Sequence, residues 1–342
     1  MADVVIAGAG IIGLSLALEL EQRGATVIVL EAGKAMGQAS SAAAGMLAAE
    51  DPAHPEALRP LARLSASLYA EFLDRLEALS GQRVVFQTEY TLEESESGPP
   101  AEVGELLPHL APGERQFKLV DERSVDLQQL GEALIVAVQA SGVELRETTA
   151  LTRLAATRDG VRIETTGSPV SADYVVDCMG AWSPAPVVPV KGQMLAVRLP
   201  AALELQAVVR TRDVYVVPRT SGPSAGRAII GSTVERVGYD KQVHARDILT
   251  LNERATALLP ALARAEFIES WSGLRPGTAD GLPLLGAAAN QPRYLLANGH
   301  FRNGILLAPA TARVMAQHIL GEPTEVDLKA FSPERFPITP QG

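Results

Sequence analysis

Two short apolar runs lie near the start of the chain, and a segment with helical spacing separates them. The first run leads into the sequence Gly8-Ala9-Gly10-Ile11-Ile12-Gly13, and the second is followed by Glu31. The pattern between them predicts a helix from about Gly10 to Arg23, which Gly24 stops. A strand, a glycine-rich turn, a helix and a second strand in this order predict a parallel βαβ unit.

Two amphipathic helices are predicted further along the chain. The first covers residues 58–79, and opposite its charged face lie the apolar residues Leu61, Leu64, Leu68, Phe72, Leu76 and Leu79. The second follows Asp126, a predicted N-cap, and stops at Gly142. Between the two helices lie short β-like pieces, such as residues 84–86, and a loop at residues 95–100.

Strand patterns dominate the middle of the chain. A strand resumes at residues 143–145, a hairpin turns near residues 158–160, and a further strand covers residues 174–178. Residues 190–271 consist mostly of alternating segments, with one helix near residues 245–259. This alternation predicts a mainly antiparallel sheet.

The last part of the chain returns to the α/β pattern. A strand at residues 294–297 precedes the run 299–305, and a helix then extends to about Leu320, with Gly321 as its stop. Because proline lacks a backbone N–H, we expect Pro309 in the first turn of this helix.

Together these elements predict an α/β fold (α+β overall) with two domains that are each discontinuous in sequence. We expect a Rossmann-like nucleotide-binding domain built from residues 1–82, 120–186 and 272–342. The second, mainly antiparallel β-sheet domain would hold the substrate and comprise residues 83–119 and 187–271. A ligand cleft is expected where the two domains meet.

The glycine-rich turn carries the chemistry of a dinucleotide site. Gly8 permits the tight turn, Gly10 lets the backbone approach a pyrophosphate, and Gly13 lets the helix pack closely on the sheet. Glu31, at the end of the second strand, is placed to accept the hydroxyls of an adenosine ribose. An ordinary glycine turn is the alternative interpretation, and the motif alone does not separate FAD from NAD.

Composition narrows the possible partners. The chain has 342 residues, of which 47% are hydrophobic, and a net charge of −10, so it offers no broad basic surface for nucleic acid or anionic lipid. A single cysteine, Cys178, excludes an internal disulfide, and a reducing cytoplasm is expected. The five histidines form no short-spaced metal-ligand cluster, and no apolar span suits a membrane, so neither a metal nor a membrane partner is expected.

A run of small residues, Ala39-Ser40-Ser41-Ala42-Ala43-Ala44-Gly45-Met46, follows the first βαβ unit. Such a run permits a ligand to lie close to the backbone. The start of a packed, alanine-rich helix is the alternative interpretation.

Five motifs together give a resemblance to a known family. They are the glycine-rich turn with Glu31, Ser41–Met46, Lys191-Gly192-Gln193, Gly273-Leu274-Arg275-Pro276-Gly277 and His300-Phe301-Arg302-Asn303-Gly304-Ile305. In these motifs the chain resembles the D-amino-acid oxidase superfamily of flavoproteins nearly from end to end. Within that superfamily it is most similar to the glycine oxidases of thiamine biosynthesis. The resemblance implies non-covalently bound FAD, so that the nucleotide-binding domain becomes an FAD-binding domain.

The same resemblance implies roles for individual residues. The cofactor would contact Gly8, Gly10, Ile11, Ile12, Gly13, Glu31, Ala32, Ala39, Ser40, Ala44, Gly45, Met46, Leu151, Gly180, Trp182, His300, Phe301, Arg302, Asn303, Gly304, Ile305 and Leu306. The catalytic set would be Arg275, Arg302, Tyr215 and Met46, with the two arginines holding the substrate carboxylate. Asp213 stands where the glycine oxidase pattern has a histidine, and the segment 83–119 is short for the family.

The chemistry of these side chains agrees with that assignment. A planar guanidinium binds a carboxylate through two parallel hydrogen bonds and so fixes the substrate in space. For each arginine the alternative is a structural ion pair, with Asp280 as the candidate partner of Arg275. For Tyr215 the alternative is an ordinary strand aromatic.

The resemblance implies the oxidative deamination of glycine, with dioxygen as the oxidant. Hydride transfer to flavin would give an imine, then glyoxylate, ammonia and hydrogen peroxide. Sarcosine, other N-substituted glycines and small D-amino acids remain alternative substrates. A quinone-linked dehydrogenase, an NAD-dependent dehydrogenase and a flavin-binding protein without turnover are further alternatives. A docking segment for the membrane would indicate the first, a colourless protein the second, and substrate bleaching of a bound yellow flavin would exclude the third. The oligomeric state stays open, a homo-oligomer included.

Overall fold

The first βαβ unit forms as the sequence predicts. The computed structural model describes residues 2–96, 107 and 109–336. Strand β1 (Ala2–Ala7), helix α1 (Ile11–Gln22) and strand β2 (Val27–Leu30) follow one another, and β1 and β2 pair in parallel. Gly24 has a φ of +87°, the left-handed conformation that ends helices.

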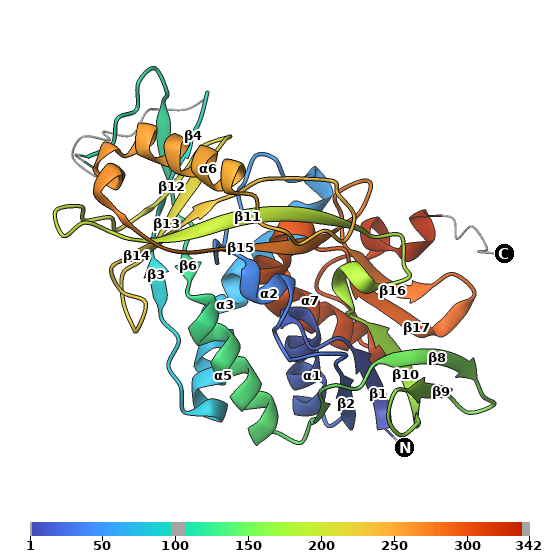
Figure 1. Ribbon diagram of the computed structural model, residues 1–342. Coiled ribbons are helices and arrows are strands. Elements are labelled where there is room, and N and C mark those ends of the chain that lie inside the picture. Colours follow the sequence, from blue (N-terminus) through green and yellow to red (C-terminus); the bar gives the residue numbers. More distant parts are fainter. Residues whose placement is uncertain (1, 97–106, 108, 337–342) are drawn as a thin grey trace.

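An eight-stranded sheet contains this unit at its centre (Figure 1). Its main path has the order β16-β17-β10-β1-β2-β7, and β9 and β8 extend it from β10. The remaining strands are β7 (Glu144–Arg146), β8 (Leu151–Ala156), β9 (Val161–Thr165), β10 (Val170–Asp177), β16 (Leu284–Ala288) and β17 (Gln291–Asn298). Strands β17, β10, β1, β2 and β7 are parallel, so the predicted Rossmann-like sheet, discontinuous in sequence, is confirmed.

Helices cover one face of this sheet, and a hairpin covers part of the other. Helices α1, α5 (Leu127–Ala140) and α7 (Gly304–Ile319) pack on the strands, and α3 (Arg59–Ser80) lies against α5 and α7 (Figure 1). On the opposite face, the β8–β9 hairpin buries Val161 and Ile163 against Val5 and Val175. The predicted N-cap is confirmed, because the Asp126 side chain accepts a hydrogen bond from Gln128 N at 2.9 Å.

The buried face of α3 differs from the predicted stripe. Its buried residues are Leu61, Ala62, Ser65, Tyr69, Leu73 and Leu76. Leu64, Leu68, Phe72 and Leu79 are only partly buried at the edges of that face. The prediction was wrong in its centre because it counted leucines and passed over Ser65 and Tyr69, whose hydroxyls bond across to α7.

A seven-stranded sheet makes up the other half of the molecule. Its order is β15-β11-β14-β13-β12-β4-β5, and every pairing is antiparallel except that of β12 with β4. The strands are β4 (Thr91–Glu94), β5 (Phe117–Val120), β11 (Val188–Arg198), β12 (Val208–Arg210), β13 (Tyr215–Arg219), β14 (Arg227–Gly231) and β15 (Glu266–Gly277). Helix α6 (Ala245–Leu258) packs on this sheet (Figure 1), and the mainly antiparallel prediction is confirmed.

Short elements connect the two sheets. Strands β3 (Phe86–Thr88) and β6 (Ser124–Val125) pair with each other, so the predicted strand at residues 84–86 begins two residues later. The predicted loop at 95–100 lies mostly outside the described residues. Helix α2 covers Ala39–Ala42, and the single-turn helices are Glu56–Leu58, Gly180–Trp182, Pro260–Arg264, Phe301–Asn303, Lys329–Phe331 and Pro333–Arg335.

Pro309 does not lie in the first turn of its helix, contrary to the prediction. Helix α7 begins at Gly304, so Pro309 lies in the second turn and cannot donate to the carbonyl of Ile305. The Tyr69 hydroxyl donates to that carbonyl at 2.9 Å. The Ser65 hydroxyl donates to Leu306 O at 2.6 Å and accepts from Ala310 N at 3.1 Å. Helix α3 therefore supplies the hydrogen bonds that the proline disrupts.

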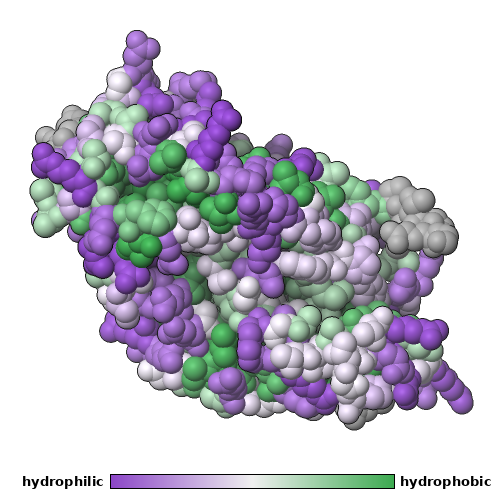
Figure 2. Space-filling model, viewed as in Figure 1, coloured by the Kyte–Doolittle hydropathy of each residue, from purple (hydrophilic) through white to green (hydrophobic). Residues whose placement is uncertain are grey.

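The surface is mixed in polarity. On the face shown in Figure 2, hydrophilic residues dominate the outer edges, and pale or green residues gather in the recessed middle. Over the described part of the chain, no helix combines the length and apolarity needed to cross a bilayer.

Candidate active site

A cavity of about 560 Å³ lies where the two sheets meet. Its walls come from the turn after β1, from α2 and the residues that follow it, from β13 and β15, and from the start of α7. The predicted site residues that line it are Gly8, Gly10, Ile11, Ile12, Glu31, Ala32, Ala39, Ser40, Ala44, Gly45, Met46, Leu151, Gly180, Trp182, Tyr215, Arg275, His300, Phe301, Arg302, Asn303, Gly304 and Ile305. Of the predicted set, Gly13 and Leu306 are not among the lining residues.

Gly13 and Leu306 lie just behind the cavity wall. A Cβ at Gly13 would lie 2.0 Å from Gly8 O, so this glycine serves the close packing of α1 on the turn. The Leu306 side chain is 1% exposed and belongs to the core between the helices. Only its backbone, in the first turn of α7, is left to face a ligand.

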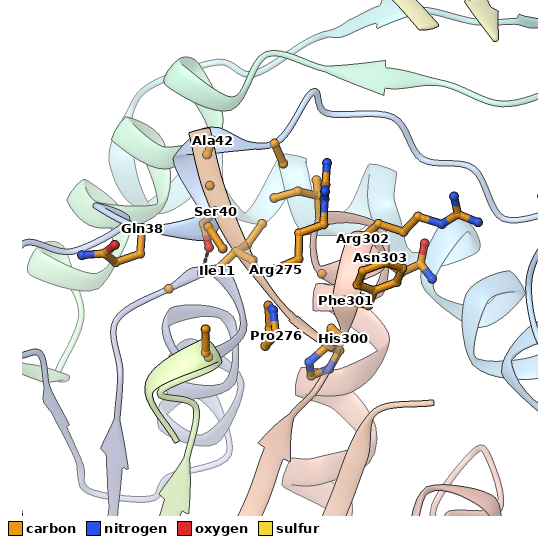
Figure 3. A pocket seen from close by; sticks show the side chains of 18 of the residues that line it. Ile11, Gln38, Ser40, Ala42, Arg275, Pro276, His300, Phe301, Arg302 and Asn303 are labelled. Carbon is orange, nitrogen blue, oxygen red and sulfur yellow. Dashed lines mark hydrogen bonds between the residues drawn. The ribbon is translucent and has the colours of Figure 1, made fainter. Parts of the chain in front are cut away.

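The turn after β1 lines the cavity and is too tight for a side chain at Gly8. Gly8 has a φ of +105°, and a Cβ there would lie 2.4 Å from Cys178 O. At the start of α1, Ile11 N donates to Ser40 Oγ at 3.0 Å, which joins the helix to the small-residue run (Figure 3). These glycines and the start of α1 fit the anion-binding end of a dinucleotide site.

Glu31 lies at the opposite edge of the same turn. Its carboxylate accepts hydrogen bonds from Ala9 N at 2.9 Å and from Gly33 N at 2.8 Å. These backbone donors fix the carboxylate in the cavity wall near Leu151. The position suits a ribose, as the spacing in the sequence predicts.

The small-residue run forms a short helix and also lines the cavity, so both interpretations of it hold in part. Helix α2 ends at Ala42, whose Cβ would be 2.6 Å from a Cβ placed on Gly273 of β15. Trp271 Nε1 donates to Ala42 O at 3.0 Å. A Cβ on Gly45 would lie 2.0 Å from Val125 O. The small side chains thus let α2 meet the antiparallel sheet while keeping the cavity open.

Arg275 is partly buried on the antiparallel side of the cavity. Its Nη1 donates to Thr233 O at 3.1 Å, and its Nη2 donates to Ser232 Oγ at 2.7 Å. The guanidinium lies against the backbone of Gly192, where a Cβ would come within 2.2 Å of both terminal nitrogens. Burial lowers the pKa of Arg275, because the charge has left water without a carboxylate beside it.

The proposed ion pair between Arg275 and Asp280 does not form. Asp280 instead binds Arg335, with Nε donating to Oδ2 at 2.7 Å. Arg275 therefore keeps donors for a ligand, since guanidinium has five and its contacts with Thr233 and Ser232 use only part of them.

Tyr215 places its ring and hydroxyl beside Arg275. It belongs to β13 and lines the cavity, so it is a strand aromatic and a site residue together. Burial raises the pKa of Tyr215, and the hydroxyl therefore stays protonated as a hydrogen-bond donor.

Arg302 differs from Arg275 in its exposure and its partner. Its side chain is 44% exposed, and its Nη2 lies 3.6 Å from Asp51 Oδ2. In Figure 3, Arg275 and Arg302 lie on the same side of the cavity, with Asn303 beside Arg302. For Arg302 the alternative interpretation was a structural ion pair, and such a pair does form. Its partner, Asp51, is not indicated by the sequence pattern.

His300 lies at the cavity wall and is fully enclosed. Its Nε2 is 3.1 Å from Thr311 Oγ1 of α7. Burial lowers the pKa of His300 to about 3, so the imidazole is neutral at physiological pH.

Several lining residues have no signal in the sequence. Asp51 and Arg210 line the cavity, and Ser232, a further lining residue, accepts a hydrogen bond from Arg275. Arg210 is buried between Glu93 and Glu122, at 2.5 and 2.9 Å. These residues lie in unrelated segments, so only the folded chain brings them together. Within the described residues, no group of three or more histidine, cysteine, aspartate or glutamate side chains is arranged to hold a metal ion.

Comparisons with known proteins agree with this site. Residues 3–318 match the DAO family model, described as FAD dependent oxidoreductase. A bifunctional protein ThiO/ThiG of Synechocystis sp. is 35% identical over 98% of this chain, and the chain spans only 54% of that relative's length.

Two further relatives are covered over nearly their full length. The glycine oxidase of Geobacillus kaustophilus is 32% identical over 96% of both chains. A crystal structure of glycine oxidase from that organism matches with a TM-score of 0.91 over 98% of this chain and 99% of the other. A crystal structure of iminodiacetate oxidase from Chelativorans sp. BNC1 matches with a TM-score of 0.83 and 25% identity, over 96% of this chain and 98% of that one.

Proposed function

The chain belongs to the DAO family of FAD dependent oxidoreductases, and from this premise we propose that it oxidises glycine and related small amino acids. When bound, FAD supplies the two-electron acceptor that takes hydride from the α-carbon and passes the electrons to dioxygen, so that glycine becomes an imine and then, with water, glyoxylate and ammonia, while hydrogen peroxide forms. The observation that carries the proposal is the partly buried guanidinium of Arg275 at the cavity wall, which has no carboxylate partner among the described residues.

Arg275 binds the substrate carboxylate in this proposal. A buried cation without an ionic partner is costly, and a carboxylate ligand supplies that partner. Thr233 O and Ser232 Oγ hold the guanidinium from behind, so its remaining donors face the cavity. The protonated hydroxyl of Tyr215 lies beside it as a further donor. The chain thereby orients the α-carbon, and such positioning supplies much of the rate.

The cofactor residues divide the cavity into recognisable parts. The turn at Gly8 and the start of α1 would hold the pyrophosphate, and Glu31 the ribose. The run from Ala39 to Met46 and the start of α7 would flank the ring system. The amide groups in the first turn of α7 have no partners within the helix, and they favour negative charge on the cofactor. The single cysteine is buried and burial raises its pKa, which supports non-covalent binding.

The biological setting is part of the same proposal. The resemblance to glycine oxidases of thiamine biosynthesis supports use of the product in that pathway, with dioxygen and a small amino acid as reaction partners. The lone cysteine supports a cytoplasmic location. We also keep the two discontinuous domains, with the residue ranges given above, as the proposed division of the chain.

Anaerobic reduction of the bound flavin tests the activity. Glycine, sarcosine and D-alanine are mixed separately with the holoprotein, and we expect bleaching of the flavin absorbance, followed by stoichiometric peroxide when air is admitted. No bleaching by any of the three would contradict the proposal.

The carboxylate role of Arg275 is tested by substitution. Arg275→Ala should raise KM for glycine by about ten- to a hundredfold, the range expected for a lost charge-assisted hydrogen bond, and Arg275→Lys should recover part of it. Arg198→Ala is the matched control, because Arg198 is an exposed arginine in the same sheet that pairs with Glu266 at 3.3 Å. An unchanged KM in Arg275→Ala would remove this residue from the role.

A further inference from the structure

Four arginines among the described residues line the cavity, and three of them have carboxylate partners. Arg210 lies between Glu93 and Glu122, at 2.5 and 2.9 Å. Arg212 pairs with Glu96 at 2.8 Å, and Arg302 pairs with Asp51 at 3.6 Å. All three line the cavity, as does Asp213.

Arg275 is the fourth, and it has no carboxylate partner within the described part of the chain. Its donors reach Thr233 O and Ser232 Oγ, which are neutral. The carboxylate of Glu235 acts on it only from a distance and binds Lys191, Gln193 and Thr233 instead. The cavity therefore offers one cation without a carboxylate partner, and near it Arg302, which already has an anion.

Asp51 is the carboxylate that compensates the charge of Arg302. It lies five residues beyond Met46, and its side chain is only 15% exposed. Its pKa is lowered: burial raises it, but the Arg302 guanidinium, the backbone N–H of Ala53, the Arg210 guanidinium and His54 together lower it more. The carboxylate is thus ionised at neutral pH, and Asp51 lines the same cavity as Arg302 and Arg275.

We propose that Asp51 determines specificity by neutralising Arg302, so that the site accepts amino acids with a single carboxylate and rejects those with a second one. This inference rests on the proposed function. Its substrate class is glycine and N-substituted or D-amino acids whose remaining substituent is uncharged. A dicarboxylate such as iminodiacetate would place its second anion beside Asp51. Two carboxylates side by side repel each other, which is strongly unfavourable.

The experiment compares sarcosine with iminodiacetate, which differ in whether the group on nitrogen carries a charge. Steady-state kcat/KM is measured for both, and for glycine, with the wild-type holoprotein, Asp51→Asn and Asp51→Glu. Glu50→Gln is the matched control, because Glu50 is the adjacent carboxylate, pairs with exposed Arg63 at 2.7 Å and does not line the cavity. Flavin content and circular dichroism establish that each variant is folded.

The wild type should favour sarcosine over iminodiacetate by at least about tenfold. Asp51→Asn frees Arg302 as a second cation, so this ratio should fall about tenfold or more, while kcat/KM for glycine changes less than about threefold. Asp51→Glu keeps the charge and should keep the preference, and Glu50→Gln should leave the ratio unchanged.

Three results would overturn the inference. Equal use of both substrates by the wild type shows that the second anion is not rejected. An unchanged ratio of sarcosine to iminodiacetate kcat/KM in Asp51→Asn shows that Asp51 does not cause the preference. If Asp51→Asn does not fold, loss of the preference in Asp51→Glu, which keeps the charge, leads to the same conclusion. A selective gain for glycine in Asp51→Asn shows that Arg302 binds the first carboxylate instead. Failure of the proposed function gives a different result, namely no flavin reduction by any substrate in any variant.

Discussion

Gly192 provides the surface on which the guanidinium of Arg275 lies. Position 192 belongs to β11 and faces residue 273 of β15 in the ladder, and Arg275 is two residues further along β15. Any side chain at position 192 would occupy the space of the guanidinium, since even a Cβ would come within 2.2 Å of it. Gly192 of the Lys191-Gly192-Gln193 motif is thus needed to leave space for Arg275 of the 273–277 motif.

Gly192→Ala should therefore impair substrate binding. We expect the displaced guanidinium to raise KM for glycine at least about tenfold, the cost of one weakened ionic hydrogen bond, while the flavin stays bound. Steady-state kinetics and the flavin spectrum check this. Gly167→Ala is the control, because a Cβ there meets only ordinary contacts at 3.8 Å, and it should leave KM unchanged.

Individual residues were predictable where their roles are local. Gly8 and Glu31 follow from a motif whose parts are close in sequence, and the structure places both on the cavity wall. The pair of Asp51 and Arg302 joins residues about 250 positions apart, and no periodicity relates them. No periodicity relates Ser232 to Arg275 either. Both pairs could therefore be identified only from the folded structure.

At the scale of elements, the start of α7 depends on α3. Pro309 removes one hydrogen-bond donor from α7, and the Tyr69 hydroxyl replaces it at the carbonyl of Ile305. Tyr69 is 1% exposed and Ile305 is 5% exposed, so this hydrogen bond is buried and its loss leaves a buried carbonyl without a partner. The first turn of α7, which faces the cavity at Ile305, is thus held by a neighbouring helix.

A double-mutant cycle tests this dependence. Tyr69→Phe should lower the free energy of unfolding by about 1–3 kcal/mol, because it leaves a buried carbonyl unsatisfied. In the Pro309→Ala background the new N–H of residue 309 can bond Ile305 O, so the same change should cost clearly less. Urea unfolding measures both, and Tyr90→Phe, at an exposed tyrosine, is the control. Equal costs in both backgrounds would contradict the coupling.

Element types were predictable, and their exact packing was not. The hairpin near residue 160 and the helix after Asp126 appear as expected, because turn and capping residues specify them locally. The position of Pro309 was misjudged because the rule for isolated helices places proline in the first turn, whereas a tertiary hydrogen bond from Tyr69 permits it in the second.

At the scale of the whole molecule, buried ionisable groups make stability depend on pH. Burial lowers the pKa of His300 to about 3, whereas an unfolded histidine has a pKa near 6.5. Between these values the unfolded chain binds the proton and the folded chain does not. His300 therefore reduces the free energy of unfolding as the pH falls below about 6.5.

This contribution should amount to about 1.4 kcal/mol for each pH unit below 6.5. We expect His300→Gln to lose less stability than the wild type between about pH 7 and pH 5, as measured by urea unfolding at each pH. His318→Gln, at an exposed position in helix α7, should keep the wild-type slope. Identical slopes in the wild type and His300→Gln would refute the argument.

The overall architecture followed from the alternation of patterns along the chain. The order βαβ, then strands, then α/β again, predicts a sheet assembled from separate segments, and the parallel pairing of β10 with both β1 and β17 confirms it. The cavity between the sheets was expected at their junction. Its distribution of charge was not, because that depends on which side chains of the second sheet point toward it.

The assembly of the large sheet from distant segments has a consequence for biosynthesis. The turn at Gly8 leaves the ribosome early, but the wall formed by Gly304 follows about 290 residues later. At a translation rate of about 5–20 residues per second, roughly fifteen seconds to a minute separate the two events. During that interval the nascent polypeptide carries only part of the cavity wall, so flavin loading must wait until the segment around Gly304 has been synthesised.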